Sequence, residues 1–361
     1  MLLAFELSGE HGTLPKAEVL ACLQASHVVY EERIFSDSIL VVDAPLSLES
    51  ELLDRLSKRL AMTHHIYEVL GMCRPDEREI QELVKKTDFG AVMNEGDTFA
   101  VRVRGEHTTS LRKNDLLTVV GECITRKGYA VNLKHPTQTF VLLFTAQTCL
   151  FCLLLQSVNK TQFEEKRPRF RPFFLPGVIM PKVARVLVNL SGIQANELFL
   201  DPFCGTGGIL IEAGMVGARL IGADVQKKMV RGAEANLHFF GLPCDLLVGD
   251  AMRMPLRDRS IDAIATDLPY GRASFVSRSR SLTAESHPVF PERLYQDALD
   301  EIYRVLKPNG KAVIVSNSPS LHYLSPESGF QLVEEHVYRV HKSLNRYITV
   351  FETAEVKEGV G

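Results

Sequence analysis

The sequence predicts an α/β protein, with a doubly wound, mostly parallel sheet in its carboxyl-terminal half preceded by smaller α+β units. After residue 177, apolar strand-like runs alternate regularly with helical runs, which is typical of a parallel sheet with helices on both faces. Before residue 158, strands also follow one another directly, which is typical of α+β units. The length of 361 residues exceeds the size at which one hydrophobic core usually stops growing, so we expect several domains.

Residues 1–72 are predicted to form a ferredoxin-like domain. Pro15 suits the first turn of a helix, and the second predicted helix is amphipathic. The order strand, helix, strand, strand, helix, strand is the split βαβ order of ferredoxin-like folds. The expected strands cover 2–7, 27–35, 38–43 and 64–71, and the expected helices cover 14–25 and 48–62.

Residues 73–157 are predicted to form a second α+β domain. Cys149 and Cys152 near its end have the spacing of a zinc-knuckle or redox pair, but no second pair accompanies them. We therefore expect two cysteines buried in a strand. The expected helices cover 75–86 and 113–128, and the expected strands cover 98–105, 129–133, 139–144 and 149–156.

Residues 158–176 are predicted to be an extended linker, because polar, basic and aromatic residues alternate there around prolines. Basic side chains outnumber acidic ones in this segment, so it could lie along a nucleic-acid phosphate backbone. A solvated linker is an equally good interpretation of the composition. The basic residues are Lys160, Lys166, Arg167, Arg169 and Arg171.

Residues 177–354 are predicted to form the doubly wound domain. Ligands of such sheets bind at the carboxyl ends of the strands, so residues at those ends are the first candidates for a functional site. A helix or loop is expected after 318, followed by the segment 330–340 and a final strand over 346–354. The expected helices cover 181–192, 207–217, 227–241 and 292–310, and the earlier strands cover 197–203, 219–225, 244–251, 261–268 and 311–318.

The overall composition argues against several classes of protein. A formal net charge of −3 argues against a protein that coats nucleic acid along its whole surface, although a local basic face remains possible. The seven cysteines form no paired framework, which suits a reducing compartment. No apolar stretch is long enough to span a membrane, and the histidines show no metal-binding spacing. We therefore expect a cytoplasmic protein with no membrane association and no bound metal.

The segment DPFCGTGG, residues 201–208, closes the first strand of the doubly wound domain and opens a helix. Its glycines let the backbone turn tightly and approach a ligand closely, and the helix amino terminus offers N–H groups without partners. A carboxylate at the strand end suits an ammonium or a hydroxyl better than a pyrophosphate. The predicted cofactor-binding residues in this loop are Asp201, Pro202, Cys204, Gly205, Thr206 and Gly207.

Two further acidic residues end the next two strands. Asp224, followed by Val225, lies where Rossmann-like folds place an acid that binds ribose hydroxyls. Asp250, followed by Ala251, is suitably placed for the amino group of an adenine. A single acid there would be a turn residue more often than not, but three in register after a glycine-rich loop indicate one ligand site. This arrangement resembles the S-adenosylmethionine site of class I methyltransferases.

The turn TDLPYG, residues 266–271, follows the fourth strand and resembles the [DN]-P-P-[YFW] motif of amino-methyltransferases, which act on exocyclic amines of nucleobases. The resemblance implies that Asp267 and the Leu268 carbonyl accept the hydrogens of the amine. It also implies that Tyr270 stacks on a base taken out of its helix, while Pro269 stiffens the turn. Leu268 stands where the motif usually has proline, so the carbonyl is retained and one rigid ring is lost. An ordinary turn at a strand end is the structural alternative.

The segment RPFFLPGVIMPKVAR, residues 171–185, resembles the stretch that precedes the cofactor loop in several amino-methyltransferases. In those enzymes it contacts the methionine end of the cofactor. Phe174, Pro176 and Met180 are therefore candidates for cofactor contacts. The alternative is an aromatic and proline cluster that packs a linker onto a domain.

Over its whole length the chain resembles the archaeal tRNA guanine-10 N2-methyltransferase family. The resembling segments are residues 5–25, 59–71, 121–133, 171–185, 201–214 and 266–271, in that order. The family implies a ferredoxin-like domain and a THUMP RNA-binding domain before a Rossmann-like class I methyltransferase domain, with S-adenosylmethionine as cofactor.

The resemblance also implies that the amino-terminal domains hold tRNA by its acceptor end. It implies that one or two methyl groups are transferred to the N2 of a guanine, with G10 as the expected position. Relatives can depend on a small zinc-binding activator protein that pairs with an edge strand. Basic residues available for phosphate contacts are Arg102, Arg104, Arg112, Lys113, Arg126, Lys127 and Lys134.

Other functions fit parts of this pattern. A related THUMP methyltransferase that acts on guanine 6 of tRNA has the same domains, and a DNA adenine methyltransferase would use the same catalytic turn. The amino-terminal domains favour RNA over DNA. A catalytically silent RNA-binding protein and a nicotinamide-dependent oxidoreductase are disfavoured by Asp267 and by the glycine loop.

Overall fold

The computed structural model describes residues 1–36, 38–44, 50–105, 112–269, 292–319, 329–341 and 344–354. The chain divides into two compact units. The first is built from Met1–Val19, His27–Lys58 and Met62–Asn159, and the second is built mainly from the chain after Lys160. Each unit has its own β-sheet.

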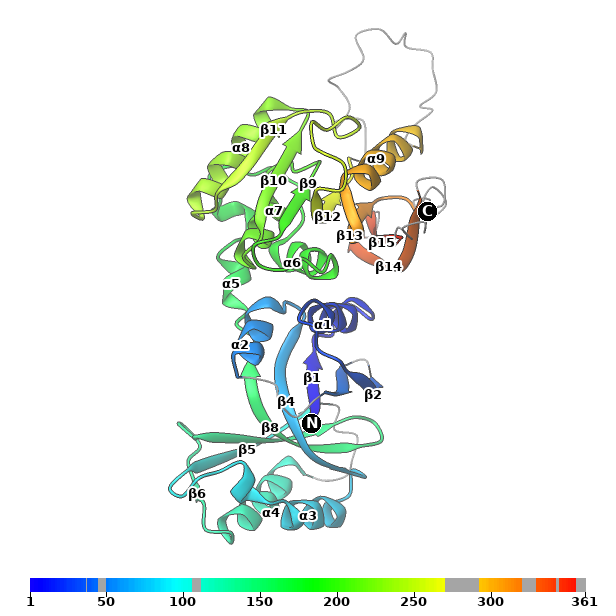
Figure 1. Ribbon diagram of the computed structural model, residues 1–361. Helices are drawn as coiled ribbons and strands as arrows, with labels where there is room; N and C mark the ends of the chain where they lie inside the picture. The colour runs from blue at the N-terminus through cyan, green and yellow to red at the C-terminus, as the bar shows by residue number, and fades with distance from the viewer. Residues whose placement is uncertain are drawn as a thin grey trace. The chain divides into compact units, whose positions relative to one another are not determined.

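The first unit begins with the expected order of elements (Figure 1). β1 pairs antiparallel with β3 on one side and with β4 on the other, as the split βαβ order requires. The prediction for these elements is therefore confirmed. The elements are β1 (Leu2–Leu7), α1 (Leu14–Ala25), β2 (Glu31–Ser36), β3 (Ile39–Asp43), α2 (Ser50–Arg59) and β4 (Thr63–Cys73).

The next elements continue the same sheet. β4 pairs antiparallel with β8, so one eight-stranded sheet runs in the order β2-β3-β1-β4-β8-β7-β5-β6. Cys149 and Cys152 lie buried in β8, as predicted. The elements are α3 (Glu77–Lys86), the short 3-10 helix Phe89–Ala91, β5 (Thr98–Gly105), α4 (Lys113–Thr125), β6 (Ala130–Val131), β7 (Gln138–Phe144) and β8 (Cys149–Ser157).

A separate hydrophobic core forms where α3 and α4 pack on β5, β7 and β8. Phe89, Phe140 and Phe151 meet at its centre, with ring centroids 5.3 to 6.2 Å apart. α3 begins at a defined point because the Asp76 carboxylate accepts hydrogen bonds from the backbone N–H groups of Arg78 and Glu79. This core fixes the face of β5 and α4 that bears a cavity described below.

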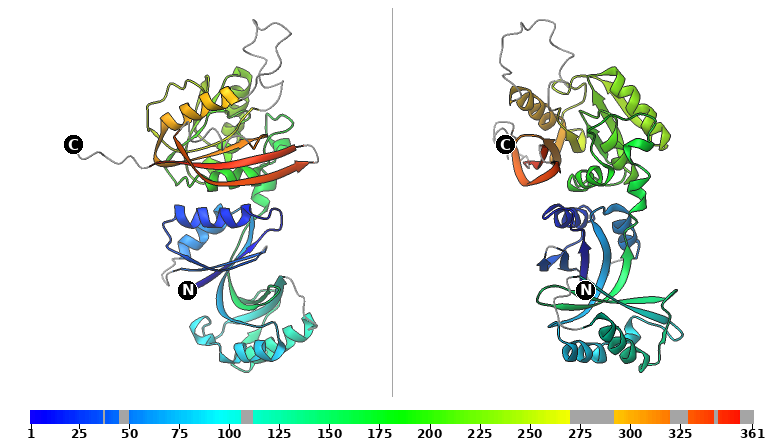
Figure 2. Two further views of the ribbon diagram at one scale, coloured as in Figure 1. Left: turned by 90° about the vertical axis from the view of Figure 1, so that its right-hand side faces the viewer. Right: turned by 180° about the vertical axis from the view of Figure 1, so that it is seen from behind.

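The second unit contains the doubly wound sheet, in the order β11-β10-β9-β12-β13-β15-β14 (Figure 1). The strands β11, β10, β9, β12 and β13 run parallel to one another. β15 is antiparallel to both of its neighbours, β13 and β14. Figure 2 shows β14 and β15 as a long pair of strands beside β13. The strands are β9 (Leu198–Asp201), β10 (Arg219–Asp224), β11 (Cys244–Val248), β12 (Ile261–Asp267), β13 (Leu306–Ser316), β14 (Phe330–His341) and β15 (Leu344–Thr353).

Helices cover this sheet. α9 packs its buried residues Tyr295, Leu299 and Ile302 against a face that carries Leu200 of β9 and Ile264 of β12. α6, α7 and α8 contact one another in sequence and pack on the strands β9 to β13. The helices are α6 (Pro181–Leu190), α7 (Gly208–Met215), α8 (Lys227–Phe239) and α9 (Glu292–Val305).

α9 ends five residues before the predicted end at residue 310. The backbone of Asn309 has a φ of 61°, and Pro308 cannot continue a helix. β13 instead begins at Leu306, and the register of its pairing with β12 shifts between Ile261 and Ala263. The residues between Leu306 and Lys311 therefore form an irregular first part of β13 and not the last turns of α9.

The segment predicted as an extended linker is not extended. It contains the short helix α5 (Thr161–Glu164) and a 3-10 turn over Pro168–Phe170. Lys166 and Arg171 are each only 5% exposed, so the hypothesis that they lie along a phosphate backbone is wrong. The prediction failed because a sequence of alternating basic and aromatic residues does not distinguish a solvated linker from a segment whose cationic side chains are buried.

Candidate functional site

The glycine loop connects β9 to α7 in the way the sequence predicts. Gly205 and Gly207 have φ values of 50° and 77°, a region that glycine enters without steric cost. A Cβ at Gly207 would lie 3.2 Å from the Cβ of Ala233 in α8, so a larger residue would also press on that helix. The loop therefore brings backbone N–H groups and the amino terminus of α7 to the carboxyl end of the sheet.

A cavity of about 360 Å³ lies at this end of β9 and β12. Its volume falls in the range of small-molecule sites, which is about 300 to 1,000 Å³. The predicted site residues that line it come from the loop after β9, the turn after β12 and the segment before α6. They are Pro176, Asp201, Cys204, Gly205, Thr206, Asp267, Leu268 and Pro269.

Other predicted site residues do not belong to the described lining of this cavity. Pro202, Gly207 and Ala251 are buried, and the remaining side chains lie nearer the ends of β10 and β11 or before α6. Phe174 and Val225 are about half exposed, at 50% and 49%. Residues outside the described lining are Phe174, Pro202, Gly207, Asp224, Val225, Asp250 and Ala251. Their roles remain predictions.

Asp201 lies at the end of β9 and is 2% exposed. Its Oδ1 accepts hydrogen bonds from the Thr266 hydroxyl at 2.6 Å and from the Phe203 N–H at 3.2 Å. Burial raises the pKa of Asp201 to about 7, so the carboxyl carries a proton at mildly acidic pH. Thr266 is the first residue of the turn TDLPYG, and the bond therefore joins the glycine loop to that turn.

Asp224 supports the glycine loop directly. One carboxylate oxygen accepts a hydrogen bond from Gly205 N–H at 3.1 Å, and the other accepts one from Gln226 N–H at 2.8 Å. Burial raises the pKa of Asp224 above its usual value. Asp250, after the next strand, accepts a hydrogen bond from Met252 N–H at 3.1 Å. Asp224 is therefore one hydrogen bond away from the cavity lining.

The turn TDLPYG, residues 266–271, begins at the end of β12 as predicted. Leu268 is buried, and its N–H donates to the carbonyl of Val315 at 2.9 Å, which fixes the turn to β13. The Pro269 carbonyl accepts a hydrogen bond from the Tyr295 hydroxyl at 3.4 Å. Tyr270 lies outside the described residues. The described part of the turn places a carboxylate, a buried apolar residue and a proline at one wall of the cavity.

Arg346 in β15 contacts the carboxylate of Asp267. Its Nη2 lies 3.4 Å from Oδ2 of Asp267 and donates to the Gly177 carbonyl at 2.8 Å. The side chain of Arg346 is buried, at 4% exposure, so this interaction is weakly screened by solvent. The sequence does not predict this contact. Arg346 comes near Asp267 only because β13 lies between β12 and β15 in the sheet.

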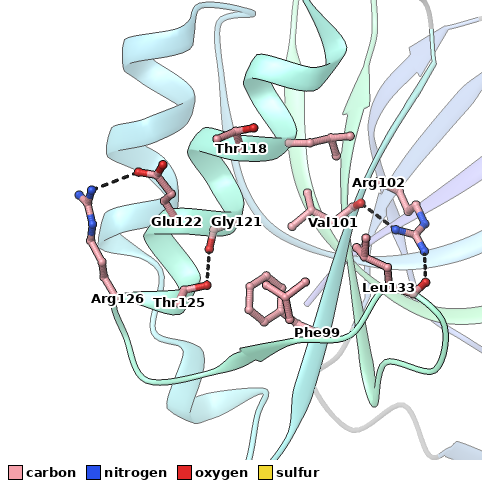
Figure 3. A pocket seen from close by; sticks show the side chains of 11 residues that line it. Phe99, Val101, Arg102, Thr118, Gly121, Glu122, Thr125, Arg126 and Leu133 are labelled. Carbon is pink, nitrogen blue, oxygen red and sulfur yellow. Dashed lines mark hydrogen bonds and ion pairs between the residues drawn. The ribbon is translucent and has the colours of Figure 1, made fainter.

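A second cavity, of about 790 Å³, lies in the first unit between α4, β5 and the segment around β6. Figure 3 shows Phe99 and Val101 on its apolar side, with Thr118, Glu122 and Arg126 of α4 and its carboxyl end opposite. Arg102 donates to the carbonyls of Val101 and Leu133, at 3.1 and 3.0 Å (Figure 3). Apolar side chains from β5 and from the segment around β6 thus share the lining of this cavity with the polar and charged side chains of Arg102, Thr118, Glu122, Thr125 and Arg126.

Some of the basic residues predicted to contact phosphates already have partners. Arg104 lies 3.5 Å from the Glu6 carboxylate, and Arg126 donates to Glu122 at 3.1 Å. The pair Arg126–Glu122 is exposed on both sides, at 71% and 59%, so this interaction is weak and exchangeable.

Within the described ranges of the chain, no helix is long and apolar enough to cross a membrane. The same described residues contain no group of three or more His, Cys, Asp and Glu side chains placed to hold a metal ion.

Comparisons with known proteins agree with this geometry. The family described as RMKL-like, methyltransferase domain, matches residues 168–348, and the THUMP domain family matches residues 74–153. The tRNA (guanine(10)-N2)-dimethyltransferase of Methanothermobacter thermautotrophicus is 35% identical over 352 residues, which cover 96% of this chain and 98% of that protein. The chain belongs to the tRNA guanine-10 N2-methyltransferase family. The Pyrococcus abyssi member of the family is 30% identical, with coverage of 96% and 98%.

Family membership confirms the resemblance predicted from the sequence and makes this chain a methyltransferase that uses S-adenosylmethionine. It also confirms the predicted fold, a THUMP domain followed by a Rossmann-like methyltransferase domain. The crystal structure of TrmN from Thermus thermophilus has the same fold, with a TM-score of 0.54 at 20% identity and coverage of 98% of this chain and 100% of that chain.

Proposed function

We propose that this protein transfers one or two methyl groups from S-adenosylmethionine to the exocyclic N2 of guanine 10 in tRNA. The observation that supports it most directly is that Asp267, at the end of β12, lines the same cavity as the glycine loop. A hydrogen-bond acceptor for an amine thus lies beside a loop suited to the methyl donor. Relatives with nearly full-length coverage bear the name tRNA (guanine(10)-N2)-dimethyltransferase, which supports position 10 and two transfers.

The residues of the cavity fit S-adenosylmethionine. Glycines with positive φ allow close approach of the backbone, while Asp201 suits a ligand with a cationic group. We propose that Asp224 and Asp250 hold the ribose and adenine, and that Pro176 and Phe174 contact the methionine end. When bound, S-adenosylmethionine supplies an electrophilic methyl group on a sulfonium.

The chain's own groups orient and deprotonate the amine. The nitrogen lone pair of guanine N2 is delocalised into the ring, so the amine must be held in line with the methyl carbon. We propose that Asp267 and the Leu268 carbonyl accept its hydrogens, and that Asp267 takes the proton that leaves as the N–C bond forms. Arg346 fixes Oδ2 of Asp267, and Tyr270 stacks on the extruded base.

The amino-terminal part of the chain is proposed to hold the tRNA. We assign residues 1–72 to a ferredoxin-like domain, 73–157 to the THUMP domain, 158–176 to the connection and 177–354 to the methyltransferase domain. The domain ranges that match the THUMP and methyltransferase families support this division. Binding by backbone shape in one domain would set which guanine reaches Asp267, without much reading of sequence.

A small zinc-binding activator protein is proposed as a second partner, joined by strand addition at an edge of the methyltransferase sheet. The two edge strands are β11 and β14. β14 exposes apolar side chains along its length, with Leu332, Val333 and Val337 between 45% and 49% exposed. β11 ends in Val248, which is 55% exposed.

The proposed reaction predicts N2-methylated guanosine at position 10 of an unmodified tRNA transcript. The transcript is incubated with labelled S-adenosylmethionine and the purified protein, alone and with the activator, and the product is mapped by nucleoside mass spectrometry. Dimethylguanosine at position 10 is the expected product. Methylation at guanine 6 would assign the related THUMP activity instead, and cofactor binding without transfer in either condition would leave an RNA-binding role.

Replacing Asp224 by asparagine is expected to weaken S-adenosylhomocysteine binding by about 1 to 3 kcal/mol, because a charge-assisted acceptor for the ribose and for Gly205 N–H is lost. Isothermal titration calorimetry measures the dissociation constant. Asp245→Asn is the matched control, since Asp245 is exposed on the neighbouring strand β11. An unchanged dissociation constant in Asp224→Asn would exclude Asp224 from cofactor binding.

A further inference from the structure

One face of α8 meets both the glycine loop and the segment that precedes α6. Met229, Gly232, Ala233 and Asn236 recur along α8 at spacings of three and four residues, which places them on the same side of the helix. Met229 lines the cavity at the end of β9 and β12, and the other three residues are buried. We name these four residues the inner face of α8.

Asn236 joins two backbone segments through its side-chain amide. Its Oδ1 accepts a hydrogen bond from the Phe173 N–H at 2.9 Å, and its Nδ2 donates to the Phe173 carbonyl at 2.6 Å. The same Nδ2 donates to the Thr206 carbonyl at 2.9 Å. Phe173 belongs to the segment before α6, and Thr206 belongs to the glycine loop. One side chain, which is 0% exposed, therefore holds both segments to α8 and to each other.

Gly232 and Ala233 leave room for the same two segments. A Cβ at Gly232 would lie 2.0 Å from Cδ1 and 2.6 Å from Cγ of the Phe173 ring, which is closer than real Cβ atoms come. Glycine is less favourable than alanine inside a helix, so the ring packed on Gly232 is the physical reason for glycine there. Ala233 is likewise the residue nearest to Gly207, where a Cβ would lie 3.2 Å from the Cβ of Ala233.

The segment held by Asn236 continues directly into the lining of the cavity. Residues 175–179, which we name the cavity wall, all line it and begin two residues after Phe173. Arg346 holds the middle of the wall, because its Nη2 donates to the Gly177 carbonyl at 2.8 Å. Thr206 lines the same cavity. The position of the wall relative to the glycine loop thus depends on the bonds that start at Asn236.

We propose that Asn236 is a positioning residue for the methyl donor, because it fixes the separation between the cavity wall and the glycine loop. This inference rests on the proposed function, since it takes the cavity as the site of S-adenosylmethionine. Asn236 is outside the described lining, so it acts through the backbones of Phe173 and Thr206. Binding sites depend on such supporting side chains, whose orientation is fixed by packing and hydrogen bonds.

Loss of the Asn236 amide has a defined physical consequence. The N–H and carbonyl of Phe173 and the carbonyl of Thr206 would lose their partner at α8. A buried polar group without a partner is costly, so these groups turn toward water and the cavity wall moves away from the glycine loop. A ligand that contacts both sides of the cavity then loses contacts with one of them.

The test measures ligand affinity in the full-length Asn236→Ala variant. S-adenosylhomocysteine is titrated by calorimetry, and its affinity is expected to fall by about tenfold to a hundredfold with unchanged stoichiometry. In steady-state methyl transfer to tRNA, KM for S-adenosylmethionine should rise while kcat changes by less than about threefold, because the wall binds the donor alike before and during transfer. Partial unfolding would instead lower the stoichiometry and kcat and leave the dissociation constant and KM unchanged.

Three further variants make the test specific. Gly232→Ala presses on the Phe173 ring and keeps the Asn236 amide, and it should weaken binding by about threefold to tenfold. It also keeps the inference testable if Asn236→Ala does not fold. The combined loss in the double variant should be smaller than the product of the single losses, because both changes release one segment. Leu237→Ala, the control, removes the buried side chain next to Asn236 and should lower the thermal stability but change the affinity by less than about threefold.

Each outcome supports or overturns the inference. Lower stability of Asn236→Ala with an unchanged dissociation constant would show a purely structural role. An equal loss of affinity in Leu237→Ala would show a general effect of loosening α8, and independent losses in the double variant would show that Asn236 and Gly232 act on different parts of the site. If the unaltered protein did not bind S-adenosylhomocysteine, the proposed cofactor site itself would fail, whereas binding that ignores Asn236 would refute this inference alone.

Discussion

Asp267→Asn is expected to lower the rate of methyl transfer to tRNA by at least about a hundredfold, the lower end of what a positioned proton acceptor contributes. The amide has nearly the same size, but it cannot take the proton and it presents N–H donors to the hydrogens of the substrate amine. Single-turnover rates measure the loss. Dissociation constants for tRNA and S-adenosylhomocysteine should change far less, because the cofactor loop and the amino-terminal domains are unaltered.

Asp262→Asn is the matched control, because Asp262 lies near the opposite end of the same strand. Its carboxylate accepts from the Leu198 N–H at 2.8 Å and pairs with Lys307, away from the cavity. Activity should persist at temperatures where this variant is folded. Substantial transfer by both Asp267→Asn and Asp267→Ala would remove Asp267 from the mechanism and favour orientation by the backbone alone.

Glu212→Gln is expected to lower the free energy of unfolding by about 3 to 5 kcal/mol. Glu212 is the carboxylate between Lys166 and Arg185, and both cations pack over the ring of buried Phe163, at 5.2 and 5.5 Å from its centroid. The amide keeps the shape of the side chain but leaves three buried cations, Lys166, Arg171 and Arg185, without the negative charge of Glu212. Urea denaturation of the full chain, followed by circular dichroism, measures the change.

Glu164→Gln provides the comparison for an exposed pair. Glu164 pairs with Arg167 at 2.8 Å on the surface of the connection, and its loss should cost less than about 1 kcal/mol. If Glu212→Gln cost as little as Glu164→Gln, the buried cations around Glu212 would be better solvated than their exposure indicates. Adding Arg171→Gln to Glu212→Gln should recover part of the stability, since one of the three repelling cations is removed.

The local pattern of the sequence was sufficient for most of the secondary structure and for the strand-end residues. Apolar runs that alternate with helical runs predict the strands β9 to β12. The acidic residues at the ends of these strands are identified because each one follows the last apolar residue of a run. The positive φ values of Gly205 and Gly207 were predictable as well, because the tight turn from β9 into α7 requires glycine. The end of α9 was predicted less well, at residue 310 instead of Val305. The amphipathic pattern of the helix does not show at which residue before Pro308 and Asn309 the helix ends.

Two features of the site depend on contacts between distant parts of the chain. Arg346 reaches Asp267 across 79 residues, because β15 inserts between β13 and β14. Arg171 and Lys166 lie in a segment whose composition suits a solvated linker, yet they turn inward to Glu212 on α7. Periodicity and motifs report which residues share a face of one element. The partner of a buried charge is set by how elements pack, because the desolvation cost of each cation is offset only by groups that the folded chain brings to it.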